Sequence, residues 1–122
     1  MEFLHKEITE QIIGAAFEVY AVLGYGFLEN VYQNAMKVEL ELRGLRVELE
    51  SKIKVLYKSM IVGHYEADIF VNEAVTVEIK VAKDYQAADE AQLLNELKAT
   101  GIRVGLLINF GRTRVDFKRM VF

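Results

Sequence analysis

The sequence predicts an α/β fold of the α+β type, with a central mixed β-sheet flanked by helices and two helices at the N-terminal end. The chain has 122 residues, of which 52% are hydrophobic and 27% are charged, a composition typical of a globular protein. Apolar residues recur at helical spacing in the first third, and strand-like patterns dominate the rest apart from one helical segment. The length suits one domain, so we expect residues 1–122 to form a single unit.

Two helices are expected before the sheet. Residues 7–23 carry apolar side chains at helical spacing, and Gly24 suits a left-handed cap at the end of this helix. Residues 27–43 form the second expected helix, which Gly44 ends. Val31, Ala35, Val38 and Leu42 share one apolar face of this helix, the expected buried face, with Leu28, Tyr32 and Met36 beside it.

The middle of the chain has strand character. Residues 45–50 and 52–57 form two expected strand segments, and Ser59 with Met60 forms the turn that follows. Residues 61–71 and 75–81 are then expected to form a pair of strands joined by a short turn.

The last third combines one helix with two strands. Residues 86–99 form the expected helix, closed by Thr100 and Gly101, and residues 102–109 are an apolar run that we expect to be buried on both faces. Residues 114–121 are expected to form an edge strand. The basic residues of this end either face solvent or form a rim that contacts phosphate: Arg112, Arg114, Lys118 and Arg119.

The hairpin over residues 61–81 has two plausible registers. A loop at residues 72–74 pairs Ile69 with Val77 and Asp68 with Glu78, and all the aliphatic residues then share one face. A loop at 72–73 places the two aliphatic sets on opposite faces. A slip of one residue is strongly disfavoured when one face is buried, so we expect the longer loop.

This register gives the hairpin a chemical consequence. Asp68 and Glu78 become cross-strand neighbours with Cβ atoms about 5 Å apart, and two such carboxylates repel each other. A divalent cation such as Mg²⁺ or Mn²⁺ would offset this repulsion, and Lys80 on the same face could stabilise charge on a phosphate. Alternatively, all three side chains point to water on a solvated strand face, which is common for so short a pattern.

The composition excludes several classes of site. The chain has no cysteine, which removes disulfides, thiolate metal sites and cysteine nucleophiles. No apolar run approaches the ~18 residues of a membrane span, and the N-terminus lacks signal-peptide features, so we expect a cytoplasmic protein with no membrane partner. The formal net charge of −3 argues against tight duplex binding by charge alone, although carboxylates that hold a metal contribute to it.

Several short motifs are spread over nearly the whole chain. Residues 26–32, GFLENVY, read G-x-x-E-x-x-Y. The other segments are ITE at 8–10, IIGAA at 12–16, YEAD at 65–68, VEIK at 77–80, AQLLN at 91–95, KATG at 98–101 and GLLINFG at 105–111.

Together these motifs resemble the small prokaryotic GxxExxY proteins, which are placed in the PD-(D/E)xK nuclease superfamily. The resemblance implies a restriction-endonuclease-like core of helix, three-stranded meander, helix and strand, the order already expected for residues 27–109. It also implies a nuclease with a Mg²⁺ or Mn²⁺ cofactor and a nucleic acid as its partner, for which DNA is the expected kind.

The resemblance assigns roles residue by residue. Asp68 and Glu78 would hold the metal, and Lys80 would help to activate water. Glu29 would be an auxiliary acid, although an acid in the first turn of a helix is also explained by the helix dipole. Gln92 would lie near the site, since related nucleases have a glutamine on this helix.

The sequence departs from the family pattern at three positions. Ala67 replaces the proline that gives the superfamily its name. Asp89 stands where a histidine is expected, and Glu96 where a tyrosine often follows. The last two changes add negative charge near the expected site, which would weaken phosphate binding.

Three functional hypotheses follow. The first is a metal-dependent nuclease with Asp68, Glu78, Lys80, Glu29 and Gln92 as its site. The second is a degenerate member that no longer cuts but binds nucleic acid or a protein partner, which the acidic residues favour. The third is an oligomerisation domain without a site, and the sequence leaves a homo-oligomer open.

Overall fold

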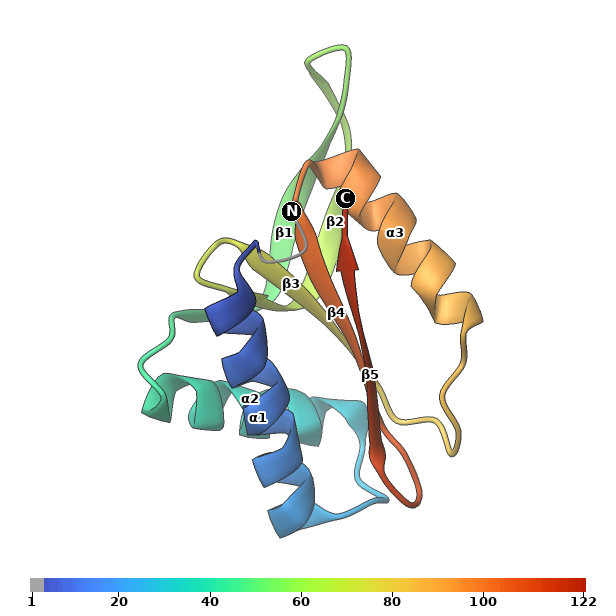
Figure 1. Cartoon of the computed structure of the whole chain (residues 1–122). Helices are drawn as coiled ribbons and strands as arrows, with labels where there is room; N and C mark the ends of the chain where they lie inside the picture. Colours follow the sequence, from blue (N-terminus) through green and yellow to red (C-terminus); the bar gives the residue numbers. More distant parts are fainter. Residues whose placement is uncertain (1–3) are drawn as a thin grey trace.

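A computed structural model describes residues 4–122. Three helices and a five-stranded sheet form two helical layers around one sheet (Figure 1). The elements in chain order are α1 (Lys6–Leu23), α2 (Glu29–Leu42), β1 (Val47–Tyr57), β2 (Met60–Val71), β3 (Val75–Lys80), α3 (Ala88–Thr100), β4 (Val104–Phe110) and β5 (Val115–Val121).

The sheet is mixed, as expected. Its strand order is β1-β2-β3-β4-β5; β3 and β4 are parallel, and the other neighbours are antiparallel. Because parallel neighbours need a crossover connection, α3 carries the chain from the end of β3 back to the start of β4. The β1-β2-β3 meander, α3 and β4 therefore follow the predicted order.

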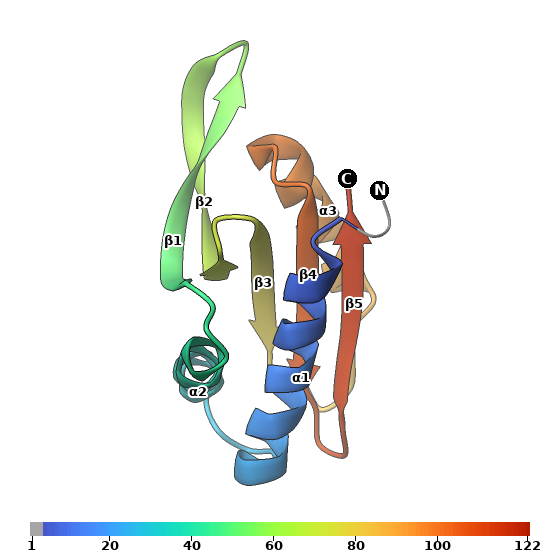
Figure 2. The ribbon, with the colours of Figure 1, turned by 60° about the vertical axis from the view of Figure 1, so that its left-hand side comes forward.

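The two faces of the sheet have different covers. Helices α1 and α2 lie on one face, and α3 lies on the other (Figures 1 and 2). The aliphatic residues of β3 and the even-numbered residues of β4 join α1 and α2 in one buried cluster. Leu93 and Leu97 of α3 instead pack against Gly105 of β4. Every residue of β4 is buried, which confirms the expected burial on both faces.

The β2–β3 hairpin has the predicted register. Val71 pairs with Val75 and Ile69 with Val77 across a turn at residues 72–74. The five aliphatic residues of the pair are fully buried on the face of α1 and α2: Ile69, Val71, Val75, Val77 and Ile79.

The expected buried face of α2 was wrong in part. Val38 and Leu42 are 61% and 78% exposed, and Leu28 is also exposed. The helix buries Tyr32, Gln33, Met36 and Leu40 instead. The reason is tertiary: Tyr32 stacks on Phe110 of β4 with 4.4 Å between ring centroids, which turns the neighbouring side of the helix toward the sheet.

Three backbone details also differ from expectation. The β1–β2 turn lies at Lys58 and Ser59, one residue earlier, and both have the positive φ of a tight hairpin turn. Residues 45–57 do not form two segments, since β1 is one strand with Glu50 at φ 52°. Gly24 ends α1 with φ 71° and ψ −160°, which is not a left-handed cap but a conformation open almost only to glycine.

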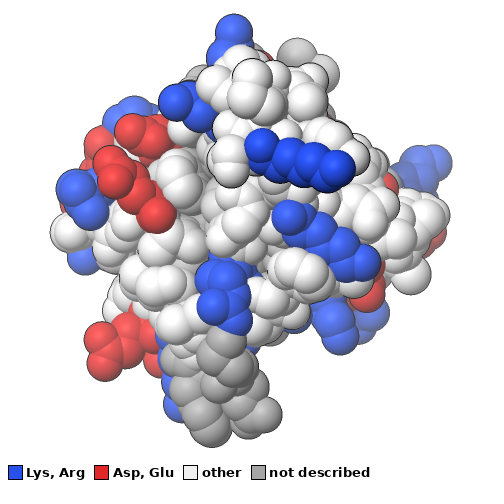
Figure 3. Space-filling view, turned by 90° about the horizontal axis from the view of Figure 1, so that it is seen from above, with Lys and Arg blue, Asp and Glu red and all other residues white. Residues whose placement is uncertain are grey.

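The β1–β2 hairpin extends beyond the rest of the sheet (Figures 1 and 2). Seen from this end, several Lys and Arg side chains lie around an uncharged area, and most of the acidic side chains in view gather on the left, with other basic side chains among them (Figure 3). Charge is therefore unevenly spread over this face of the molecule.

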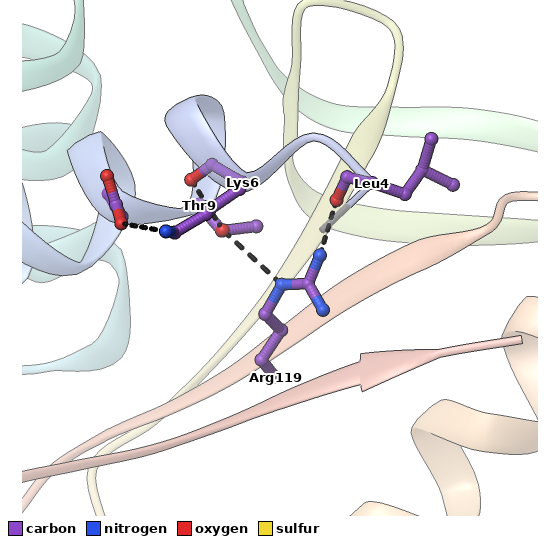
Figure 4. A network of polar contacts seen from close by, with 5 residues as sticks. Leu4, Lys6, Thr9 and Arg119 are labelled. Atoms are coloured by element: carbon purple, nitrogen blue, oxygen red, sulfur yellow. Dashed lines mark hydrogen bonds and ion pairs between the residues drawn. The ribbon is translucent and has the colours of Figure 1, made fainter. Parts of the chain in front are cut away.

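Arg119 of the basic C-terminal stretch has a structural role. Its guanidinium donates to the main-chain carbonyl of Leu4 and, at 3.4 Å, to the hydroxyl of Thr9, which itself donates to the carbonyl of Lys6 at 3.0 Å (Figure 4). These contacts tie β5 to the first turn of α1. Arg112 and Arg114, in the turn before β5, and Lys118, on this edge strand, are exposed. None of the helices within residues 4–122 is long and apolar enough to cross a membrane.

Candidate active site

The five residues singled out in the sequence come from four elements. Asp68 lies in β2, Glu78 and Lys80 in β3, Glu29 at the start of α2 and Gln92 in α3. Glu29, Asp68, Glu78 and Lys80 lie within electrostatic range of one another, since Lys80 lowers the pKa of all three carboxyl groups. The fold thus brings these four together, and Gln92 approaches Glu78 and Lys80 from the α3 side.

Asp68 is fixed by two hydrogen bonds, one to its side-chain carboxylate and one to its main-chain carbonyl. The paired ladder of β2 and β3 stops at Ile69 and Val77, and the Asp68 carboxylate accepts the N–H of Ile79 at 2.8 Å. The Gln33 side chain of α2 donates to the carbonyl of Asp68 at 2.7 Å. Burial raises the pKa of Asp68, whereas the Ile79 N–H and then Lys80 lower it. The carboxylate is therefore held in a defined orientation.

Glu78 is the most strongly perturbed acid. Its pKa is raised to about 8, first by burial and next by the nearby Glu96, while Lys80 and the main-chain N–H of Asp68 lower it. The Tyr65 hydroxyl donates to the Glu78 carboxylate and lies 3.3 Å from the Thr76 hydroxyl. A positive charge near Glu78 would therefore favour its ionised form and lower its raised pKa.

Lys80 is the cation common to the cluster. It lowers the pKa of Glu29, Asp68, Glu78 and Glu96, each of which burial raises. The Lys80 ammonium therefore interacts with four carboxyl groups, one each from α2, β2, β3 and α3. Strongly perturbed acids around one lysine are typical of functional sites.

A small pocket lies between β3, β4 and α3. Its walls include Glu78, Lys80, Gln92 and Glu96, with Leu93 and Leu107 as the apolar part and Asp89 at the same pocket. Its volume of about 10 Å³ is close to that of one water-sized sphere. Gly105 sets this narrow spacing, because a Cβ there would meet Leu93 at 3.2 Å.

Sequence reasoning missed three side chains of this region. Gln33 lies one helical turn after Glu29 and is 7% exposed, yet its helical position alone gives no reason for burial. Tyr65 falls, by strict alternation, on the face of Ile69, although its hydroxyl reaches Glu78. Glu96 was noted only as a departure from a family pattern. Tyr32 packs instead of entering the site: its ring stacks on Phe110, and its hydroxyl donates to the carbonyl of Gly24 at 2.5 Å.

The comparisons with known proteins agree with this geometry. Residues 6–120 match the family described as the PD-(D/E)XK nuclease superfamily. The chain belongs to the PD-(D/E)XK nuclease superfamily. No curated protein matches the sequence.

A solved structure supports the superfamily fold. The structure titled "Crystal structure of SSO0001" superposes with a TM-score of 0.58 at 16% sequence identity, and the similarity covers 96% of this chain. The chain spans 58% of the length of that protein. At this identity the similarity shows the fold alone, a mixed sheet with flanking helices.

PD-(D/E)XK nucleases generally use divalent metals, and the site's donor chemistry fits such an ion. Its carboxylate oxygens are the hard ligands that Mg²⁺ and Mn²⁺ prefer, and a buried oxygen of Glu96 has no hydrogen-bond partner. Within residues 4–122 no three His, Cys, Asp or Glu side chains are already placed to hold a metal. Instead, the Tyr65 hydroxyl donates a hydrogen bond to the Glu78 carboxylate, and the Ile79 N–H donates one to the Asp68 carboxylate.

Proposed function

We propose that this chain is a metal-dependent nuclease of the GxxExxY type that hydrolyses phosphodiester bonds in DNA. Asp68 and Glu78 would hold a Mg²⁺ or Mn²⁺ ion, with Lys80, Glu29 and Gln92 completing the site. The observation that carries the proposal is geometric: the Asp68 carboxylate accepts the N–H of Ile79, between Glu78 and Lys80, and these two residues line a small pocket with Glu96. Carboxyl groups gathered in this way repel one another in a packed protein, whereas a cation site uses them.

The residues have distinct roles in the proposed reaction. When bound, a divalent cation polarises the phosphate and lowers the pKa of a coordinated water. The Ile79 N–H and Gln33 fix Asp68, and Tyr65 fixes Glu78, so both carboxylates are oriented before substrate binds. Lys80 orients the attacking water or offsets the charge that develops on the phosphate. Gln92 and Glu29 border this centre from α3 and α2.

Surface charge supports a nucleic acid as the substrate. The basic side chains around the uncharged surface in Figure 3 offer contacts to a phosphate backbone, whereas the acidic groups gather elsewhere on that view. The net charge of −3 limits purely electrostatic affinity, so binding is expected to be weak at high salt.

Cleavage of labelled nucleic acids tests this function. Single- and double-stranded DNA and RNA are incubated with the protein in Mn²⁺ or in EDTA. We expect cleavage of DNA in Mn²⁺ only, and a loss of about 10²–10³-fold in Lys80→Ala, as for removal of a transition-state donor. Lys37→Ala, which removes a surface lysine of α2 that pairs with Glu41 at 2.6 Å, is the matched control and should cleave as the wild type does. Cleavage in EDTA, or equal rates in both lysine variants, would refute the proposal; cleavage of RNA alone would reassign the substrate.

Two observations favour the second candidate, a nuclease fold that binds without cutting. The Tyr65 hydroxyl already donates a hydrogen bond to the Glu78 carboxylate. Asp89 and Glu96, which line the pocket, add negative charge that repels phosphate. Such a module would bind DNA or a protein partner and would show no cleavage under any of the conditions above. A gel-shift signal without cleavage, unchanged in Lys80→Ala, would establish this alternative.

A further inference from the structure

Glu96 has an unsatisfied oxygen at the proposed site. Among the buried side-chain nitrogen and oxygen atoms of residues 4–122, Oε2 of Glu96 lacks a hydrogen-bond partner. Its other oxygen lies 3.5 Å from the Gln92 amide, a long contact at best. A buried polar atom without a partner is costly, so a partner is expected that the polypeptide itself does not supply.

The position of this oxygen narrows the choice of partner. Glu96 lies on α3 and shares the small pocket with Glu78 and Lys80. Glu78, Asp89 and Glu96 all line this pocket, so three carboxyl groups border one small space and repel one another. A water molecule in the pocket would satisfy the oxygen but would leave the repulsion between the acids in place. A cation would do both.

We infer that Glu96 is a further metal-binding residue, whose carboxylate shares with Glu78 the divalent cation of the site. The inference rests on the proposed function and extends it, since the proposed function assigns the ion to Asp68 and Glu78 alone. Two carboxylates that border a narrow polar pocket suit Mg²⁺ or Mn²⁺, because these ions commonly bind one or two carboxylates and keep several waters.

The same geometry explains why α3 approaches the sheet so closely. Gly105 lets Leu93 and Leu97 lie against β4, and both flank Glu96 along the helix. The Gln92 amide lies one turn earlier on the same helix face, 3.5 Å from the Glu96 carboxylate. The helix thereby presents one acid to the edge of the sheet where Glu78 and Lys80 lie.

Titration of the purified protein with Mn²⁺ tests the inference directly, with calorimetry and thermal unfolding as readouts that need no activity. Glu96→Gln keeps the size of the side chain and removes its charge. Glu18→Gln, which changes an exposed acid on α1, is the matched control. We expect Glu96→Gln to weaken Mn²⁺ binding by about tenfold or more, and Glu18→Gln to leave it unchanged. In EDTA, Glu96→Gln should unfold at or above the wild-type temperature, which establishes that it folds.

The outcomes separate this inference from the proposed function. Equal Mn²⁺ affinity in Glu96→Gln and Glu18→Gln would overturn the role of Glu96, while the nuclease proposal would stand on cation binding by the wild type. Tighter DNA binding by Glu96→Gln at unchanged Mn²⁺ affinity would overturn it too, because Glu96 would then act only by repelling phosphate. Absence of Mn²⁺ binding in the wild type would refute both the inference and the cation role in the proposed function.

Discussion

The two faces of the sheet differ in their side chains: one is packed with apolar residues, and the other carries charged groups that repel one another. On the face of α1 and α2, β3 contributes Val75, Val77 and Ile79, all fully buried in one apolar cluster. On the face of α3, the same strand contributes Thr76, Glu78 and Lys80, and the acids there have raised pKa values. One strand of six residues thus serves stability with one set of side chains and chemistry with the other. The comparison shows that the apolar face supplies the rigidity on which the polar face depends.

The largest expected effect comes from breaking the apolar face. Leu106→Ala removes a fully buried side chain of β4 from the cluster with α1 and α2. We expect a loss of about 2–5 kcal/mol in the free energy of unfolding, because the deletion leaves a cavity. Urea denaturation followed by circular dichroism measures it. Val38→Ala, at a position 61% exposed, should change stability by less than about 0.5 kcal/mol; similar losses in both would contradict this assignment of faces.

A smaller effect is expected where α3 meets the sheet. In Gly105→Ala the added Cβ would lie 3.2 Å from Leu93 and 3.3 Å from Leu97. Moving α3 outward to relieve this overlap should cost about 1–3 kcal/mol and lower the cleavage rate, because Gln92 and Glu96 move with the helix. The matched control is Gly63→Ala, since a Cβ at Gly63 meets nothing within 4 Å. Wild-type cleavage by Gly105→Ala would show that the α3 spacing does not matter to the site.

The pH dependence of stability sharpens the comparison at the polar face. The pKa of Glu78 is raised from 4.5 to about 8 in the folded protein, so the native state binds its proton more tightly than the unfolded state does. Between these two values, stability in EDTA should fall as pH rises, by at most about 1.4 kcal/mol per pH unit for one proton. Thermal unfolding from pH 5 to pH 8 measures this slope. In Glu78→Gln the slope should be shallower, and an unchanged slope would mean that Glu78 does not cause it.

Much of the fold was predictable because apolar pattern and register depend on local rules. The alternation in β2 and β3 admitted only one register that buries Ile69, Val77 and their neighbours together, and that register is present. The faces of α2 were less predictable. Tyr32 and Met36 compete with Val38 and Leu42 on a helix that is apolar on more than one side, and the stacking of Tyr32 on Phe110 decides between them.

The polar side of the site was predictable only in part. Asp68, Glu78 and Lys80 follow from one hairpin, so their proximity follows from strand pairing. Tyr65 does not, because it belongs to the buried odd-numbered residues of β2, and only its long side chain brings the hydroxyl to Glu78 on the neighbouring strand. Glu96 reaches the pocket through the packing of α3, which depends on contacts distant in sequence.

The most direct test of the central claim is the effect of Mn²⁺ on the stability of the wild type and of Asp68→Asn at pH 7. Binding to the native state alone should stabilise the wild type by about 2.7 kcal/mol at a Mn²⁺ concentration one hundred times the Kd. Asp68→Asn keeps the side-chain size and should lose most of this gain while remaining folded in EDTA. An equal gain in both proteins, or no gain in the wild type, would contradict a divalent-cation site on the α3 face of the sheet.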